Sequence, residues 1–195
     1  MFYRVFYACD NSHKYLTQDL SVYKSFAREC LMCGRKLVTY DEKEGIHQLL
    51  CDGKGSYLDF LDATTSGKNY IYISDLAMDA IVRNSVSGIN ERFCCKAISG
   101  KTEHFYHKCD ITGIIALNEK AMFLKKKNFC NECGQFEWNK KGIGKLIIDE
   151  SLWNGCDVCR LLYFENIFIC SERFKNIYHS EGLTGLTFET LKVIE

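Results

Sequence analysis

The sequence predicts an α+β fold, in which a mixed or antiparallel sheet carries short helices and two distant cysteine knuckles meet. Aromatic and β-branched residues alternate at the N-terminus, a strand–helix–strand pattern occurs twice, and a CxxCG tetrad also occurs twice. Hydrophobic residues make up 47% of the 195 residues, which is enough for a core. We therefore expect residues 1–195 to form a single folded unit.

The first expected element is a strand over residues 2–8, where aromatic and β-branched side chains dominate. The stretch 16–29 has no clear period and leads into the first tetrad. A second strand is expected over 36–40, where the chain leaves that tetrad. Polar or glycine-containing loops are predicted at 41–45, 53–55 and 64–69.

A strand–helix–strand pattern then occurs twice with the same internal spacing. The segment Tyr70-Ile-Tyr-Ile-Ser74 precedes a helical stretch over 75–84, and Ile167-Phe-Ile-Cys-Ser171 precedes one over 172–181. Each serine stands where an N-cap is expected, and a glycine-containing stop and a further strand follow each helix, with Gly88 matching Gly185 and Ile89 matching Leu186. The match is either chance or a structural duplication of two β-α-β units that flank the tetrads.

The two predicted helices differ in the regularity of their apolar residues. In the second helix Phe174, Ile177 and Tyr178 follow at i, i+3 and i+4, which predicts one buried stripe. In the first helix Leu76, Ala80 and Val82 are less regularly placed, with Met78 and Ile81 nearby. Both units are interpreted as scaffold, and Ser171 as a cap and not a nucleophile, because no histidine or base motif accompanies it.

The two tetrads are the strongest functional signal in the chain. They read Cys30-Leu-Met-Cys33-Gly34 and Cys130-Asn-Glu-Cys133-Gly134. A two-residue spacer lets both thiolates of a tetrad bind one ion, and the glycine permits a tight backbone turn. Four sulfurs complete a tetrahedral site with no position left for a substrate. We therefore predict that Cys30, Cys33, Cys130 and Cys133 bind one structural Zn²⁺.

This site sets the expected organisation of the chain. The zinc-ribbon parts are expected at about 26–40 and 126–140, with a central insert at about 41–125 between them. A C-terminal β-α-β segment is expected at about 143–195. A catalytic three-coordinate metal is disfavoured because four thiolates are available.

The sequence has 12 cysteines and shows no export signal, so reduced thiols and metal binding are expected in place of disulfides. Cys156-Asp-Val-Cys159 has the CxxC spacing but no following glycine, and its part in a second metal site stays open. The other cysteines are interpreted as small buried apolar residues: Cys9, Cys51, Cys94, Cys95, Cys109 and Cys170.

No sequence motif of an enzyme is present. HExxH, GxSxG, the P-loop and a GxGxxG turn are all absent, and Gly142-Ile-Gly144 is interpreted as a turn. His104 and His107 stand three apart in a segment expected to be extended, where they would face opposite sides. Their part in a second metal site also stays open. We expect a protein that is not an enzyme.

Charge and hydropathy argue against nucleic acid and membranes as partners. The chain has 25 basic and 25 acidic residues, whereas nucleic-acid-binding domains usually carry a basic excess. The clusters Lys125–Lys127 and Lys140–Lys141 are interpreted as solvated loop residues beside the second tetrad. No apolar run approaches the ~18–20 residues that span a bilayer, and the N-terminus lacks the features of a signal peptide. We expect a cytoplasmic protein without membrane association.

A set of segments in the C-terminal third adds a family resemblance. In order they are Cys130-Asn-Glu-Cys133-Gly134, Leu146-Ile-Ile-Asp149, Trp153-Asn-Gly155-Cys-Asp157-Val-Cys159-Arg160-Leu161, Ser171-Glu-Arg-Phe174 and Glu181-Gly-Leu-Thr-Gly185-Leu-Thr-Phe188. With the first tetrad, this succession resembles the double-CXXCG motif family of bacteria, known from the swarming-inhibition immunity proteins of myxobacteria. The likeness covers about residues 128–190, and the absence of proline departs from the myxobacterial members.

The resemblance implies an immunity protein that binds and neutralises a cognate protein toxin. It also implies that Cys156 and Cys159 pack in the core and do not bind metal. The alternative is a zinc-ribbon module that binds nucleic acid or has a regulatory role. The identity of the toxin and the oligomeric state are not predicted.

Overall fold

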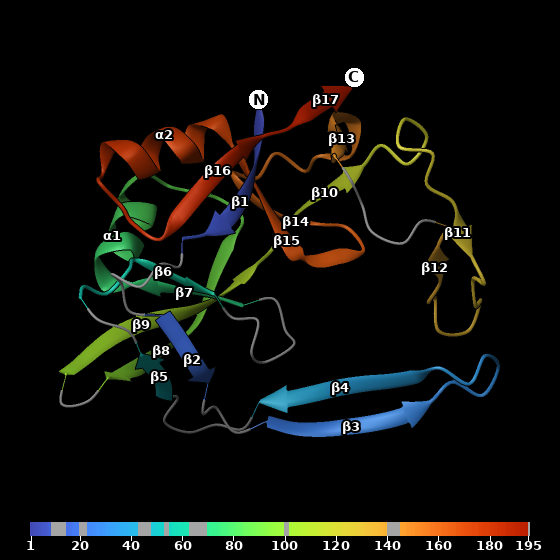
Figure 1. Ribbon diagram of the computed structural model, residues 1–195, viewed down its shortest axis with the longest axis horizontal. Helices are drawn as coiled ribbons and strands as arrows, with labels where there is room; N and C mark the ends of the chain where they lie inside the picture. Colours follow the sequence, from blue (N-terminus) through green and yellow to red (C-terminus); the bar gives the residue numbers. More distant parts are fainter. Residues whose placement is uncertain are drawn as a thin grey trace.

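The computed structural model is mostly β-sheet, with two short α-helices among the residues that it describes (Figure 1). This confirms the expectation of β-sheet with short helices. Neither helix has the length and apolar character needed to cross a membrane, within the described part of the chain. The structure describes residues 1–8, 15–19, 23–42, 48–52, 55–62, 70–99, 102–139 and 145–194.

Most strands are short and rich in aromatic and β-branched residues. The strands are β1 (Phe2–Tyr7), β2 (Tyr15–Asp19), β3 (Tyr23–Glu29), β4 (Lys36–Glu42), β5 (Gln48–Asp52), β6 (Phe60–Asp62), β7 (Tyr70–Ser74), β8 (Ile89–Ser99), β9 (Thr102–Ile111), β10 (Gly113–Leu117), β11 (Lys126–Lys127), β12 (Glu137–Trp138), β13 (Ile147–Asp149), β14 (Val158–Leu161), β15 (Phe164–Ser171), β16 (Leu186–Thr190) and β17 (Lys192–Ile194). The helices are α1 (Asp75–Arg83), α2 (Glu172–Ser180) and a 3-10 turn, η2 (Glu150–Leu152).

The strands predicted over 2–8 and 36–40 correspond to β1 and β4, and the ambiguous stretch 16–29 contains β3 and most of β2. Strand β4 extends into the first predicted loop, because it pairs with β3 as far as Glu42. The rest of that loop and most of the other two predicted loops lie outside the described residues. The same holds for Gly142-Ile-Gly144, Lys140–Lys141 and Cys9.

Two large sheets and two hairpins make up the fold. The strand orders are β2-β5-β8-β9-β7-β6 and β16-β1-β15-β14-β10-β13-β17. Both sheets are mixed, since β5 runs parallel to β8 and β10 runs parallel to β14. The hairpins β3–β4 and β11–β12 project on the side of the molecule opposite to α1 and α2 (Figure 1).

The same order of elements occurs in both halves of the chain. A first strand (β1 or β9) leads through a hairpin (β3–β4 or β11–β12) to a strand, a helix and a strand (β7-α1-β8 or β15-α2-β16). Ser74 and Ser171 are the N-caps of α1 and α2, as predicted, and each side chain accepts from a backbone N–H three residues later at 3.2 Å. The repeated sequence pattern therefore marks a structural duplication.

The two halves exchange their first strands. Strand β1 lies between β15 and β16 of the second half, whereas β9 lies between β7 and β8 of the first. The registers agree, because Ser171 pairs with Phe2 as Ser74 pairs with Tyr106. The range 41–125, expected as an insert, thus contains β5 to β10, of which β5 to β8 have counterparts after the second hairpin.

The helices pack against a core that both halves share. The Phe60 ring, at the start of β6, lies 6.3 Å from the Phe174 ring and 6.0 Å from the Tyr178 ring of α2. Phe174 and Tyr178 are buried and Ile177 packs against the same cluster, which confirms the predicted stripe.

The buried face of α1 includes Ala80 and Ile81 of the residues noted in the sequence, but not Leu76 or Val82. Leu76 and Val82 are each 65% exposed, whereas Ala77, Ala80 and Ile81 are buried. These three residues follow at i, i+3 and i+4, the spacing of one helix face. The two alanines are small enough to bring α1 close to the core, while Leu76 and Val82 lie on the solvent side of the helix.

Candidate metal centre

Each tetrad forms a tight turn of the same geometry. The backbone N–H of Cys30 donates to the Arg35 carbonyl at 2.9 Å, and that of Cys130 donates to the Gln135 carbonyl at 2.9 Å. Gly34 and Gly134 have φ angles of +71° and +70°. This left-handed conformation favours glycine, as the sequence pattern predicted.

The structure brings all four predicted cysteines together. Their Sγ atoms all lie within 4.8 Å of one another, and the group could hold a metal ion. Cys30 and Cys130 are 3.7 Å apart, as are Cys33 and Cys133, from Sγ to Sγ. Four sulfurs at about 2.3 Å from one zinc would lie about 3.8 Å apart in a tetrahedron. A disulfide requires about 2.05 Å, so these are free thiols at the spacing of metal ligands.

Backbone N–H groups help to ionise one of these thiols. The N–H of Cys133 hydrogen-bonds to Cys130, and together with other hydrogen bonds it lowers the pKa of the Cys130 thiol to about 7. The N–H of Cys33 acts in the same direction on Cys30, but burial and the neighbouring thiols raise the pKa of Cys30 overall. In the metal-free protein, Cys130 is therefore the first of the two to become a thiolate, which is the form that binds metal.

An arginine of the first knuckle ties it to the second. The Arg35 guanidinium donates to the backbone carbonyl of Gln135 at 2.8 Å and to that of Asn128 at 3.0 Å. It also lies 3.3 Å from the Glu137 carboxylate. Sequence analysis missed Arg35, although its place directly after the glycine of the first tetrad was a usable signal. Arg35 orients the two knuckles toward each other without contacting the sulfurs.

The residues left open for a second metal site do not join this cluster. Cys159 is buried in the core and Cys156 packs against the same side chains. His107 lies between the carboxylates of Glu91 and Asp75, while the His104 ring lies 3.7 Å from the Tyr57 ring. Among the described residues, the four tetrad cysteines are the one group of three or more metal-ligating side chains.

Four of the remaining cysteines are buried, as predicted: Cys51, Cys95, Cys109 and Cys170. Cys94 is exposed, and the prediction for it was wrong. Cys94 and Cys95 are neighbours in β8, where successive side chains point to opposite faces of the sheet. Because Cys95 faces the core, Cys94 faces solvent.

The central lysine of the predicted basic cluster has partners within the protein. The Lys126 ammonium lies 4.4 Å from the centre of the Tyr163 ring and 3.3 Å from the Glu119 carboxylate. These contacts occupy the central charge of Lys125–Lys127. The cluster was interpreted as solvated loop residues, whereas Lys126 and Lys127 form strand β11 and Lys126 has partners.

A pair of equivalent aspartates was given no role by sequence analysis. The carboxylate of Asp59 accepts from Ser74 of its own half and from Thr184 of the other half, at 2.6 and 2.7 Å. The carboxylate of Asp157 accepts from Ser171 at 3.0 Å and from Ser87 at 3.1 Å in the same arrangement. Each aspartate precedes its capping serine by 15 or 14 positions, which was the signal available in the sequence.

Comparison of the chain with protein-family models, with curated proteins and with solved structures finds no match.

Proposed function

We propose that Cys30, Cys33, Cys130 and Cys133 hold one structural Zn²⁺ that joins the two halves of the protein. The observation that carries this proposal is the spacing of their Sγ atoms, which fits a closed tetrahedral thiolate site. Joining knuckles 100 residues apart costs roughly 4 kcal/mol of chain entropy, and structural zinc contributes about 10–16 kcal/mol in small peptides. When bound, the ion would cross-link the two knuckles. The four thiolates would hold it, and Arg35 would keep the knuckles facing each other.

Metal analysis of Cys133→Ser tests this proposal. Wild-type protein purified without chelator should carry one zinc per chain, and Cys133→Ser should carry much less. The matched control is Cys94→Ser, because Cys94 is also a free thiol but lies outside the cluster. A zinc content near zero in the wild type, or near one in Cys133→Ser, would overturn the structural zinc.

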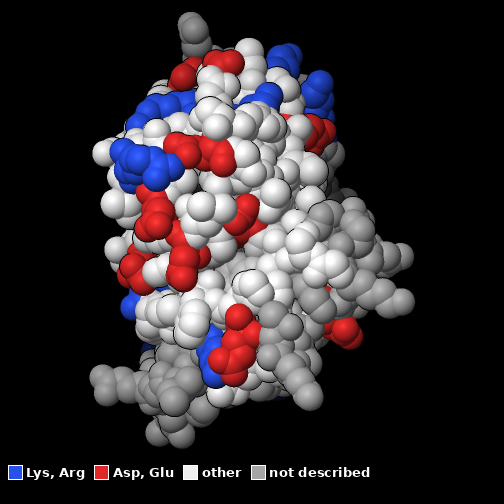
Figure 2. Space-filling model, turned by 90° about the vertical axis from the view of Figure 1, so that its left-hand side faces the viewer, with Lys and Arg blue, Asp and Glu red and all other residues white. Residues whose placement is uncertain are grey.

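We further propose that the protein is a non-catalytic immunity protein that binds and neutralises a cognate protein toxin. The order of motifs around the second tetrad supports this function, since it resembles the double-CXXCG immunity proteins. A closed thiolate site also favours a scaffold over a catalyst. Acidic side chains gather on the side of the molecule where α1 and the ends of β8 and β9 lie, which suits a partner with a basic surface (Figure 2).

Co-expression tests this function. The product of the neighbouring gene should be toxic when expressed alone and harmless when expressed together with this protein, and the two should co-purify as a complex. Toxicity that persists in the presence of the protein, or a neighbouring product without toxicity, would overturn the immunity proposal and leave the zinc proposal standing.

A further inference from the structure

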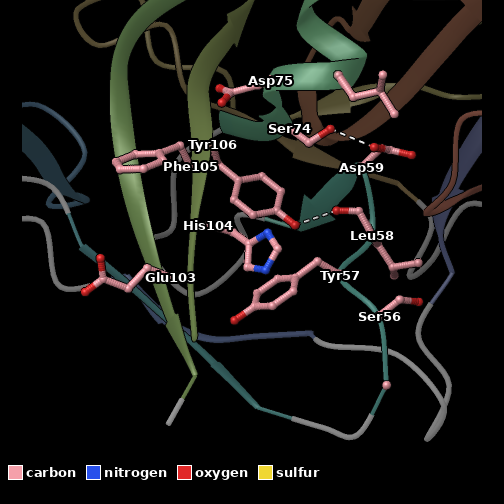
Figure 3. Close-up of a pocket in the computed structure, with 12 residues that line it drawn as sticks. Ser56, Tyr57, Leu58, Asp59, Ser74, Asp75, Glu103, His104, Phe105 and Tyr106 are labelled. Atoms are coloured by element: carbon pink, nitrogen blue, oxygen red, sulfur yellow. Dashed lines mark hydrogen bonds between the residues drawn. The ribbon is translucent and has the colours of Figure 1, made fainter. Parts of the chain in front are cut away.

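A cavity of about 670 Å³ opens in the first half of the molecule, within the size range of ligand sites. It lies between the start of α1, the strand β9 and the segment before β6. Figure 3 shows the carboxylates of Asp59 and Asp75 at one end and the rings of His104 and Tyr57 at the other. Carboxylates together with aromatic faces are the surroundings that a guanidinium group favours, because it pairs with the former and stacks on the latter.

The second half shows what occupies the equivalent place there. Arg173, the second residue of α2, donates through Nη1 to the Asp157 carboxylate at 2.5 Å and through Nη2 to the backbone carbonyl of Asn84. Asp157 is buried beneath this guanidinium, at 7% exposure. The carboxylate therefore has four hydrogen-bond donors, of which one is a cation.

The first half lacks this cation. Its α1 has Leu76 at the position of Arg173, and Leu76 is 65% exposed at the edge of the cavity. Asp59 keeps the hydrogen bonds to Ser74 and Thr184, so its carboxylate is held in the same orientation as that of Asp157. Among the described residues no cation pairs with Asp59. The second half thus supplies its own arginine to Asp157. In the first half the equivalent carboxylate, that of Asp59, faces an open cavity.

We propose that this cavity binds an arginine side chain of a partner protein, with the guanidinium beside Asp59 as Arg173 lies beside Asp157. The adjacent rings of Tyr57 and His104, with centroids 3.7 Å apart, supply the wall along which the side chain lies. The identification of this partner as the toxin rests on the immunity function, whereas the recognition of arginine does not. The acidic side chains in the middle of this side of the molecule (Figure 2) would favour the approach of a basic surface.

The binding test uses the zinc-loaded full chain and amide NMR spectra. N-acetyl-arginine amide should shift the amide signals of residues 57–59, 74–77 and 104–106, and the uncharged N-acetyl-citrulline amide should bind at least about tenfold more weakly, since it cannot form the charged pair. Equal binding of the two compounds, or an absence of shifts with both, would overturn the proposal. Free arginine that binds about tenfold more tightly than the blocked form would point to a free amino acid as ligand and would also overturn it.

A pair of variants locates the site. Leu76→Arg supplies the cavity with its own guanidinium, as in the second half, and should abolish the shifts caused by N-acetyl-arginine amide. Val82→Arg is the matched control, because Val82 lies on the same helix with the same 65% exposure and does not line the cavity. Shifts that persist in Leu76→Arg, or disappear in Val82→Arg, would place the binding elsewhere and overturn the proposal.

The same variants separate this proposal from the immunity function. If the wild type neutralises the toxin, Leu76→Arg should lose at least about tenfold in affinity for it and Val82→Arg should not. Equal neutralisation by wild type and Leu76→Arg would overturn the arginine site and leave the immunity function in place. A wild type that binds N-acetyl-arginine amide but neutralises no toxin would overturn the immunity function and leave arginine recognition in place.

Discussion

Gly134 and Gly88 both have positive φ angles, of +70° and +90°, but different space around them. A Cβ added to Gly134 would have no heavy atom within 4 Å, whereas one added to Gly88 would lie 2.0 Å from the carbonyl oxygen of Val158. Gly134→Ala should therefore lower the free energy of unfolding by about 1–2 kcal/mol, the cost of the left-handed backbone alone.

Gly88→Ala should lower the free energy of unfolding by more than Gly134→Ala, because the strand that carries Val158 would also have to move. Chemical denaturation of both zinc-loaded variants measures the two losses. Equal losses would mean that the contact between Gly88 and Val158 is looser in solution than in the structure.

The cysteines outside the metal cluster differ in reactivity because they differ in burial. Burial raises the pKa of the thiols of Cys109 and Cys159 to about 12, so at pH 8 both are protonated and shielded. N-ethylmaleimide should therefore modify Cys94 well before either of them, even though burial and nearby carboxylates raise the pKa of Cys94 as well. Peptide mass spectrometry measures the order. Modification of Cys109 or Cys159 as fast as Cys94 would contradict the burial of that residue.

At the scale of elements, each helix begins on a serine that makes two kinds of hydrogen bond. Ser74 and Ser171 accept from the helix backbone and donate to Asp59 and Asp157. Replacing either serine with alanine should lower the free energy of unfolding by about 1–3 kcal/mol, since an N-cap is lost and a carboxylate loses one donor. The exposed Ser180 at the end of α2 is a control. Ser180→Ala should change the free energy of unfolding by less than about 0.5 kcal/mol.

Urea unfolding of the three serine variants checks this prediction. The duplication predicts similar losses of stability in Ser74→Ala and Ser171→Ala, because the two caps have equivalent partners. A loss in either cap variant no larger than in Ser180→Ala would show that the cap and its aspartate contribute little to stability.

The two helices and their caps could be predicted from the sequence because they depend on residues close together in the chain. Ser74 and Ser171 precede their helices directly, and the stripe of Phe174 and Tyr178 is regular. The exposed face of α1 could not be predicted from Leu76 and Val82 alone. Which face of α1 is buried depends on Phe60 and other residues of the core, which come from strands elsewhere in the chain.

At the scale of the whole molecule, the metal cluster could be predicted although its members are distant in sequence. A closed structural zinc site takes four ligands, and the two tetrads contain four cysteines with the right local spacing. The exchange of β1 and β9 between the halves could not be predicted, because strand pairing has no comparable local signature. The cavity beside Asp59 depends on that exchange, since β9 supplies one of its walls.

The exchanged strands and the proposed zinc would hold the two halves together in different ways, so removing the metal should have a local effect. Strand β1 pairs with β15, and β9 pairs with β7. The backbone hydrogen bonds of these pairs are independent of any ion. Treatment with a chelator should therefore speed the hydrogen exchange of residues 30–35 and 128–138, while α1 and α2 keep their protection. Cys133→Ser should show the same pattern without chelator. Loss of protection throughout both sheets would mean that the metal supports the entire fold, and no change at the knuckles would mean that they hold no metal.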